Sequence, residues 1–134
     1  MSHGTIDHPW ELSTPSGRGT YLAWTDPEAD TPALVVQVGK TTLRYHLACL
    51  DDLHAMLVAH GDWMELASKD EGKDVKPDTV EAWGRADDNP VGGWYGLKKG
   101  LRGRFANYVP PVLAQQGRVT FEKRGRSMWV RATS

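Results

Sequence analysis

The sequence has little cysteine, isoleucine and asparagine, and it has no long apolar run. Its one cysteine, Cys49, excludes an intrachain disulfide and a zinc site built from several cysteines. No stretch approaches the roughly 18 apolar residues of a membrane-spanning helix, so we expect no membrane partner. The first ten residues lack a basic stretch followed by an apolar one, so we expect no secretory signal and a cytoplasmic location. Scarce Ile and Asn against 14 Gly are typical of a GC-rich bacterial genome.

Motifs for nucleotide binding, metal binding and catalysis are also missing. Neither the dinucleotide-binding glycine pattern nor the P-loop pattern occurs, and no two histidines have metal-binding helical spacing. Glu71-Gly72-Lys73 has the Glu-x-Lys spacing of many metal-dependent nucleases, but it lies in a stretch rich in Gly and Lys. Cys49 precedes a predicted helix, and as a nucleophile it would need a base such as His46 in contact. We therefore expect no catalytic residue, no metal and no cofactor.

Acidic side chains are almost absent from the last third of the chain. Residues 92–134 hold 9 Lys and Arg but one acid, whereas residues 1–91 hold 7 Lys and Arg and 16 acids. The whole chain carries a formal net charge of −1, so it divides into an acidic front and a basic end. Such a division indicates an anionic partner. It equally allows the acidic front to pair with the basic end.

The chain has the length of one ordinary domain, and its hydrophobic content of 40% suffices for one core. We predict a single compact domain over 1–134, with a lobe at 1–48 and another at 49–134. Alternating and β-branched residues predict three antiparallel strands at 19–25, 33–38 and 41–47, with Gly39-Lys40 as a hairpin turn. Residues 10–13 are the candidate for a fourth strand.

The apolar period becomes helical after residue 49. Leu50, Leu53 and Leu57 form one stripe of a helix over 50–60, which Gly61 is expected to cap. A short strand at 63–67, a charged loop at 68–76 and a second helix opened by 77–79 follow.

A third helix is predicted from Trp94 to Tyr108, because apolar residues step by three and four along it. Its three glycines (96, 100 and 103) each weaken a helix by about 1 kcal/mol relative to Ala, so they indicate either close backbone packing or a break into shorter pieces. A helical turn beginning at Pro110-Pro111 and ending at Gly117 comes next. Strands at 118–122 and 127–132 then enclose a basic turn at 123–126.

Residues 50–132 thus run helix, short strand, helix, helix, β-hairpin, with a helix ending at Gly117, a strand, a basic tip and a return strand. This order resembles the winged-helix family of nucleic-acid-binding domains. The resemblance is one of pattern, and the long loop at 67–76 and the double proline depart from it. It implies an α+β fold in which an N-terminal antiparallel β-meander packs on a winged-helix-like C-terminal part with three to four helices and a terminal β-hairpin. It also implies that one helix lies against a duplex while the wing touches the backbone.

The basic residues of these two elements are the candidate nucleic-acid contacts, since cations that neutralise phosphates supply most of such affinity. The helix contributes Lys98, Lys99, Arg102 and Arg104, and the hairpin tip contributes Lys123, Arg124 and Arg126.

Two other classes of function remain open. A protein–protein interaction module with the same fold would use Trp94 and Tyr95 as an exposed aromatic pair. A small-molecule-binding protein or enzyme would use the junction between the meander and the helices. We expect a non-enzymatic binding protein, with nucleic acid ahead of a protein partner.

Overall fold

The computed structural model describes residues 4–133 and has the predicted α+β architecture. The first sheet is an antiparallel meander in the order β1-β2-β3-β4, whose strands are Trp10–Ser13, Thr20–Asp26, Ala33–Val38 and Thr41–His46. The second sheet has the order β5-β7-β6, whose strands in chain order are Met64–Glu65, Val119–Arg124 and Ser127–Ala132. The helices are α1 (Cys49–His60), α2 (Val80–Trp83), α3 (Phe105–Tyr108) and α4 (Pro110–Gln115).

The meander forms where the sequence predicts it, and residues 10–13 do join it as β1. Gly39 has a φ of +58°, the left-handed conformation that a tight turn between β3 and β4 requires. Along β2, the side chains of Tyr21 and Ala23 are buried, whereas Leu22 and Trp24 are partly exposed. One face of β2 therefore packs on the core, as its alternation predicts.

The helix α1 is confirmed with nearly the predicted bounds. Leu50, Leu53 and Leu57 are buried along one side, and burial of each such leucine contributes about 1.5–3 kcal/mol. Gly61 adopts a φ of +71° and donates its N–H to the carbonyl of Leu57, so it caps the helix as expected. Thr79 likewise caps α2, because its hydroxyl accepts from the N–H of Ala82. Within residues 4–133, no helix has both the length and the apolar character to cross a membrane.

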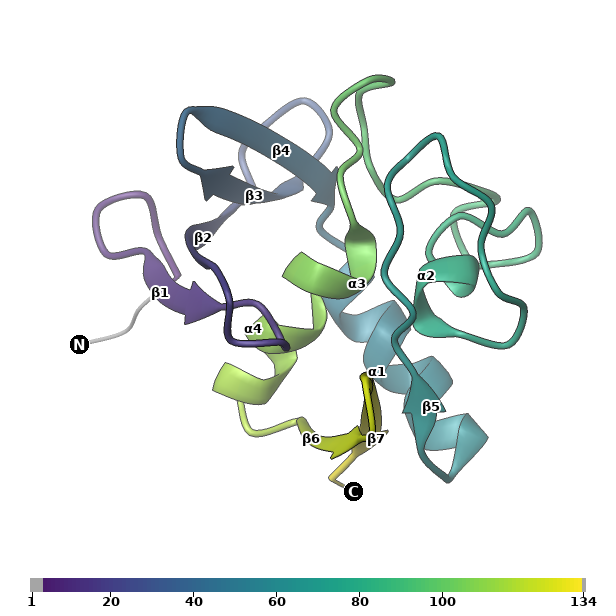
Figure 1. Cartoon of the computed structure of the whole chain (residues 1–134). Coiled ribbons are helices and arrows are strands. Elements are labelled where there is room, and N and C mark those ends of the chain that lie inside the picture. Colours follow the sequence, from purple (N-terminus) through teal and green to yellow (C-terminus); the bar gives the residue numbers. More distant parts are fainter. Residues whose placement is uncertain (1–3, 134) are drawn as a thin grey trace.

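One hydrophobic core joins the two predicted lobes. Its buried members come from both sheets and all four helices, from Leu12 in β1 to Val130 in β7. Helix α4 lies at the centre, in contact with α1, α3, β1 and β6. Figure 1 shows the meander at the upper left, the second sheet at the lower right and the helices between them.

The predicted helix over 94–108 is wrong, because only Phe105–Tyr108 are helical. The segment before them runs instead along the open edge of β4. The N–H of His46 donates to the carbonyl of Tyr95 and the N–H of Leu97 donates to the carbonyl of Arg44, both at 2.9 Å. Gly96 forms an isolated antiparallel bridge with Tyr45. The segment thus covers an edge that would otherwise expose unpaired backbone groups.

The glycines explain why this segment is not helical. Gly100 and Gly103 have φ values of +87° and +62°, which no α-helix contains. A Cβ on Gly96 would lie 2.9 Å from the Cα of Arg102, so the chain folds back on itself there. The alternative of close backbone packing and shorter pieces is therefore what the structure has.

The irregular path of this segment predicts the sign of the change in unfolding free energy that Gly96→Ala causes. In a helix, alanine in place of glycine would raise the free energy of unfolding by about 1 kcal/mol. In the structure, the added methyl group would meet the backbone of Arg102. We expect Gly96→Ala to lower the free energy of unfolding by about 1–3 kcal/mol in urea denaturation.

Gly72→Ala is the matched control, because neither glycine has a positive φ and a Cβ on Gly72 would meet nothing within 4 Å. We expect it to change stability by less than about 0.5 kcal/mol. A stabilised Gly96→Ala variant would contradict the observed path.

Candidate functional site

Two acids of the charged loop at 68–76 neutralise two of the predicted contacts. Asp70 accepts a hydrogen bond from Nε of Arg104 at 2.7 Å. Glu71 accepts from the backbone N–H groups of Gly100 and Arg102, both at 2.9 Å, and lies 3.8 Å from the Arg102 guanidinium. The basic segment therefore meets an acidic partner within the chain, and that partner is this loop rather than the meander.

The ionisation of both acids reflects these contacts. The hydrogen bond from Arg104, together with its charge, lowers the pKa of the exposed Asp70. Burial acts to raise the pKa of Glu71, but the N–H donors of Gly100 and Arg102 outweigh it and the pKa is lowered. Both groups are charged at neutral pH, so the pairing with the arginines is fully formed there.

Lys98 and Lys99 lie in the same segment and are exposed. Within residues 4–133, neither forms an ion pair. They are not on a helix face, but their charges are available to solvent.

Arg124 is turned away from the other two cations of the hairpin. Its Nε donates to Glu122 at 2.6 Å, and its guanidinium lies 4.8 Å from the ring centre of Trp129 and 5.6 Å from that of Trp63. A planar guanidinium on aromatic rings is a favourable contact. Arg124 therefore packs against the tryptophans of the second sheet with 45% of its side chain exposed, whereas Lys123 and Arg126 are exposed near the tip and, within the described residues, form no ion pair.

The expected exposed aromatic pair is not formed, because Tyr95 is fully buried. Its hydroxyl donates to Asp52 at 2.9 Å, and its ring stacks on Trp83. Trp94 contacts two guanidinium groups, those of Arg85 at 4.2 Å and Arg102 at 4.7 Å from its ring centre. Both aromatic residues therefore serve packing, which sequence alone did not distinguish from surface exposure.

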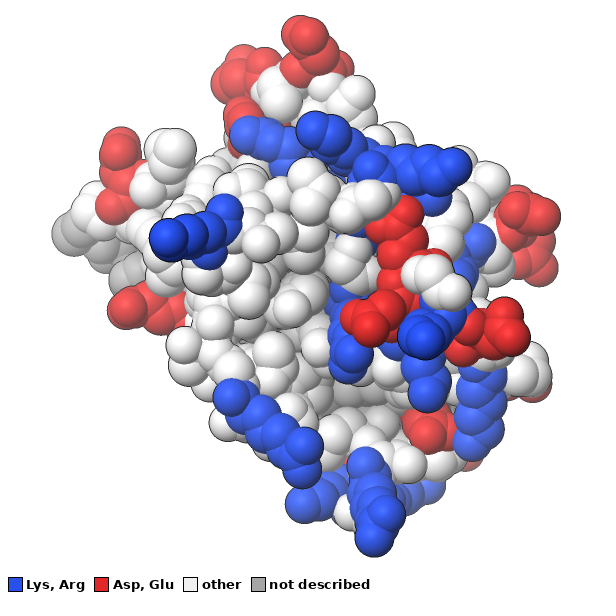
Figure 2. Space-filling view, turned by 45° about the horizontal axis from the view of Figure 1, so that its top comes forward, with Lys and Arg blue, Asp and Glu red and all other residues white. Residues whose placement is uncertain are grey.

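Two of the predicted contacts, Lys123 and Arg126, lie at one groove of about 1000 Å³, which we call the cationic groove, whereas Lys98 and Lys99 lie outside it. Its walls are the turn between β1 and β2, helix α3 with the residue before it, Ser68, and the β6–β7 hairpin tip. Within the described part of the chain, its lining includes no acidic residue and four basic ones: Arg18, Arg104, Lys123 and Arg126. Figure 2 shows a hollow of uncharged surface in the lower centre of the view, with basic side chains bordering it.

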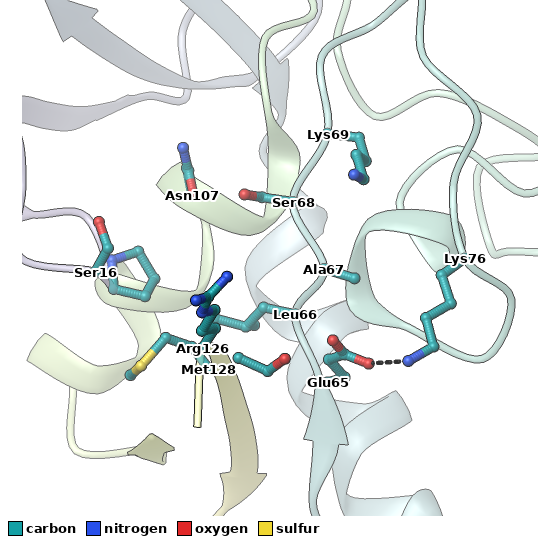
Figure 3. Close-up of a pocket in the computed structure, with 12 residues that line it drawn as sticks. Ser16, Glu65, Leu66, Ala67, Ser68, Lys69, Lys76, Asn107, Arg126 and Met128 are labelled. Carbon is teal, nitrogen blue, oxygen red and sulfur yellow. Dashed lines mark hydrogen bonds and ion pairs between the residues drawn. The ribbon is translucent and has the colours of Figure 1, made fainter. Parts of the chain in front are cut away.

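A second hollow of about 390 Å³ adjoins the cationic groove and shares part of its lining. Ser16, Ser68, Asn107 and Arg126 surround the opening between the two (Figure 3). The one acid in this second hollow is Glu65, which Lys76 binds at 2.7 Å. That hydrogen bond lowers the pKa of Glu65. Within the described residues, the two hollows together present hydroxyl, amide and guanidinium donors, and the carboxylate in their lining, Glu65, is paired with Lys76.

Sequence reasoning missed Arg18 and the two serines. Arg18 lies in the acidic front, so the charge division directed attention away from it. Ser16 belongs to the turn-like stretch 14–17, which marks a turn but gives no indication of what the turn faces. The packing of β1 on α4 and the contact of Tyr21 with Tyr108 place this turn near the hairpin tip.

A buried ion pair holds the loop at 68–76 in place. Glu81 is fully buried and accepts from the backbone N–H groups of Lys69 and Ala106 and from Arg85 at 3.1 Å. Arg85 also donates to four carbonyls of the loop, those of residues 69, 70, 71 and 73. Burial raises the pKa of Glu81, against the opposing effects of Ala106 N–H and Arg85. The pair thus fixes one wall of the groove.

Residues 4–133 include no group of three His, Cys, Asp or Glu side chains placed to hold a metal ion. Cys49 is buried, and burial raises the pKa of its thiol well above the usual range. The thiol is therefore protonated at neutral pH, unlike a reactive cysteine.

The family model of DUF6855, a family of unknown function, matches residues 2–133. The chain belongs to this family. No curated protein and no solved structure matches the chain. Both sheets, the loop at 68–76 and the cationic groove all fall inside the matched range.

Removing Arg85 is expected to be costly and pH-dependent. Arg85→Met leaves Glu81 buried without a counter-ion, so we expect a loss of about 3–5 kcal/mol in unfolding free energy at pH 7. The folded-state pKa of Glu81 is already raised and rises further without Arg85. The folded state therefore binds a proton more readily than the unfolded state, and lowering the pH recovers part of the loss. Guanidinium denaturation at pH 7 and pH 5 measures this difference against the unaltered protein.

Arg44→Met is the control, because Arg44 pairs with Asp26 at 3.4 Å with 47% of its side chain exposed. We expect it to cost less than about 1 kcal/mol at both pH values. An equal loss at both pH values for Arg85→Met would show that Glu81 does not carry the effect.

Proposed function

We propose that this protein binds nucleic acid through the cationic groove, without catalysis, cofactor or metal, in a cytoplasmic setting. The observation that carries the proposal is the convergence of basic residues from distant segments on a groove whose lining, as far as residues 4–133 form it, has no acid. Within residues 4–133, Arg18, Lys123 and Arg126 form no ion pair. Cations free of internal partners are the ones that can neutralise phosphates and release counterions.

The hairpin takes the role that the winged-helix resemblance predicts for a wing. The order of helix, short strand, three further short helices and hairpin supports this comparison, with one helical element more than the sequence pattern. Lys123 and Arg126 of the hairpin line the groove. Arg124, between them in sequence, contacts Trp63 and Trp129 and so holds the hairpin against the rest of the second sheet.

Neither α3 nor α4 is suited to read bases in the major groove. Helix α4 has six residues, of which the first four are buried, and α3 has four residues. A helix that reads a duplex must enter the major groove with exposed side chains. Contacts to the phosphate backbone therefore dominate, and they position nucleic acid without specifying its sequence.

Binding of a labelled DNA at two salt concentrations tests the proposal. We expect affinity to fall steeply with salt, because each neutralised phosphate releases counterions. Lys123→Ala and Arg126→Ala should each weaken binding across sequences and reduce the salt slope by about 1. Fluorescence anisotropy titrations measure both quantities.

Arg131→Ala is the matched control, because Arg131 is an exposed arginine of the same hairpin that lines a different hollow. We expect it to leave the affinity nearly unchanged. An equal effect of Arg131→Ala would indicate general charge attraction instead of a site, and no binding at low salt would refute the proposal.

Asp70 competes with phosphate for Arg104 in this arrangement. Asp70→Asn removes the charge that holds Arg104, so we expect tighter DNA binding in the same titration. Asp74→Asn is the control, since Asp74 is an exposed acid of the same loop without an ion pair in the described chain. Equal gains from both variants would show that overall charge, and not release of Arg104, is responsible.

A further inference from the structure

The cationic groove continues into a third hollow of a different chemical character. Arg104 and Asn107 line both, so they mark the passage from one to the other. The third hollow, of about 380 Å³, has apolar or aromatic side chains in its lining (Val38, Leu43, Leu101 and Tyr108), together with Thr41 and with Asp70, the acid that Arg104 holds. We call it the apolar hollow. It places an apolar surface directly beside a surface that attracts phosphate.

Leu101 is the most informative side chain of the apolar hollow. It is 37% exposed, which is unusual here for a large aliphatic residue, and it follows Gly100 in the segment that covers β4. Its side chain supplies exposed apolar surface directly beside the cationic groove. The ligand of the combined site therefore needs an anionic part and a flat or apolar part within a short distance of each other.

Single-stranded nucleic acid has both parts accessible at once. Its phosphates are anionic, and its unpaired bases present apolar faces that pack on aromatic and aliphatic side chains. In a duplex those faces are stacked inside the helix, so the apolar hollow would stay empty. Ser16 of the β1–β2 turn, Ser68 and Asn107 surround the gap between that turn and the hairpin tip, which a flexible strand enters more easily than a rigid duplex (Figure 3).

We infer that the ligand is a single strand of nucleic acid, with phosphates in the cationic groove and a base in the apolar hollow. This inference rests on the proposed function and narrows it. Asn107 lies at the passage between the two parts, and no hydrogen bond within residues 4–133 occupies its side-chain amide. It is therefore placed to donate to a phosphate or a base as the strand crosses from one hollow to the other.

The test compares one labelled DNA strand with the same strand annealed to its complement, at low salt. We expect the single strand to bind about tenfold more tightly, the gain from one base on an apolar surface. Inorganic phosphate in excess over the phosphate groups of the labelled strand should compete poorly with that strand for the protein. Effective competition by phosphate would overturn the inference, because it would indicate an anion site that makes no use of the bases.

Two variants separate the two parts of the site. Leu101→Ser removes apolar surface, and Asn107→Asp places a charge at the passage. We expect Leu101→Ser to weaken single-strand binding about tenfold and to leave duplex binding nearly unchanged, and Asn107→Asp, whose charge lies in the lining of the cationic groove, to weaken binding of both probes. Val58→Ser and Gln115→Glu are the matched controls: Val58 is 47% exposed on α1, and Gln115 is exposed on α4, both outside the three hollows.

The failures of the two proposals are distinguishable. Duplex binding as tight as single-strand binding, or equal effects of Leu101→Ser on both probes, would overturn the single-strand inference and leave nucleic-acid binding standing. Absence of binding by either probe at low salt would refute the proposed function itself. Circular dichroism of each variant confirms that a loss of binding is not a loss of fold.

Discussion

The buried pair of Glu81 and Arg85 is the contact that holds α2, the start of α3 and the loop at 68–76 together. Glu81 ties α2 to the start of α3 and to the loop at 68–76, and Arg85 collects four carbonyls of that loop. A charged pair out of water is costly, and hydrogen bonds offset that cost at both carboxylate oxygens of Glu81 and at two nitrogens of Arg85, whose buried Nε has no partner within residues 4–133. Here those hydrogen bonds are also what give an irregular, charged loop a single conformation. The loop then presents Asp70 and Glu71 to the basic segment across from it.

The segment at 94–104 shows how charge and backbone geometry act together. Its glycines allow two left-handed turns, and these turns bring two backbone N–H groups onto Glu71. A helix over the same residues would have used those N–H groups internally and exposed all four cations. In the irregular path, Arg102 and Arg104 are paired with acids, whereas Lys98 and Lys99 are exposed. The charge division of the sequence is thus partly satisfied inside the fold.

Local regularity could be predicted from the sequence, and long-range contact could not. The leucine spacing and Gly61 sufficed for α1, and Gly39 sufficed for the β3–β4 turn, because each reflects interactions between near neighbours. The apolar spacing of 94–108 fits a helix, but it also fits an irregular segment whose apolar side chains are buried one after another. It therefore predicted a helix where the structure has an irregular segment. The pairing of Asp70 with Arg104 joins residues 34 positions apart, and no local pattern reports it. The place of Arg18 in the groove depends in the same way on how β1 packs on α4.

The stacking of Arg124 on Trp63 and Trp129 also bears on the entropy of the hairpin. Hairpin tips are ordinarily mobile, and a partner that contacts one has to pay for ordering it. Trp63 directly before β5, Arg124 of β6 and Trp129 of β7 pack together close to the tip of this hairpin and hold its two strands in place. Lys123 and Arg126, on either side of the turn, therefore start from a backbone that is already fixed. Whatever partner meets them loses less conformational freedom on contact, which lengthens its residence without any additional bond.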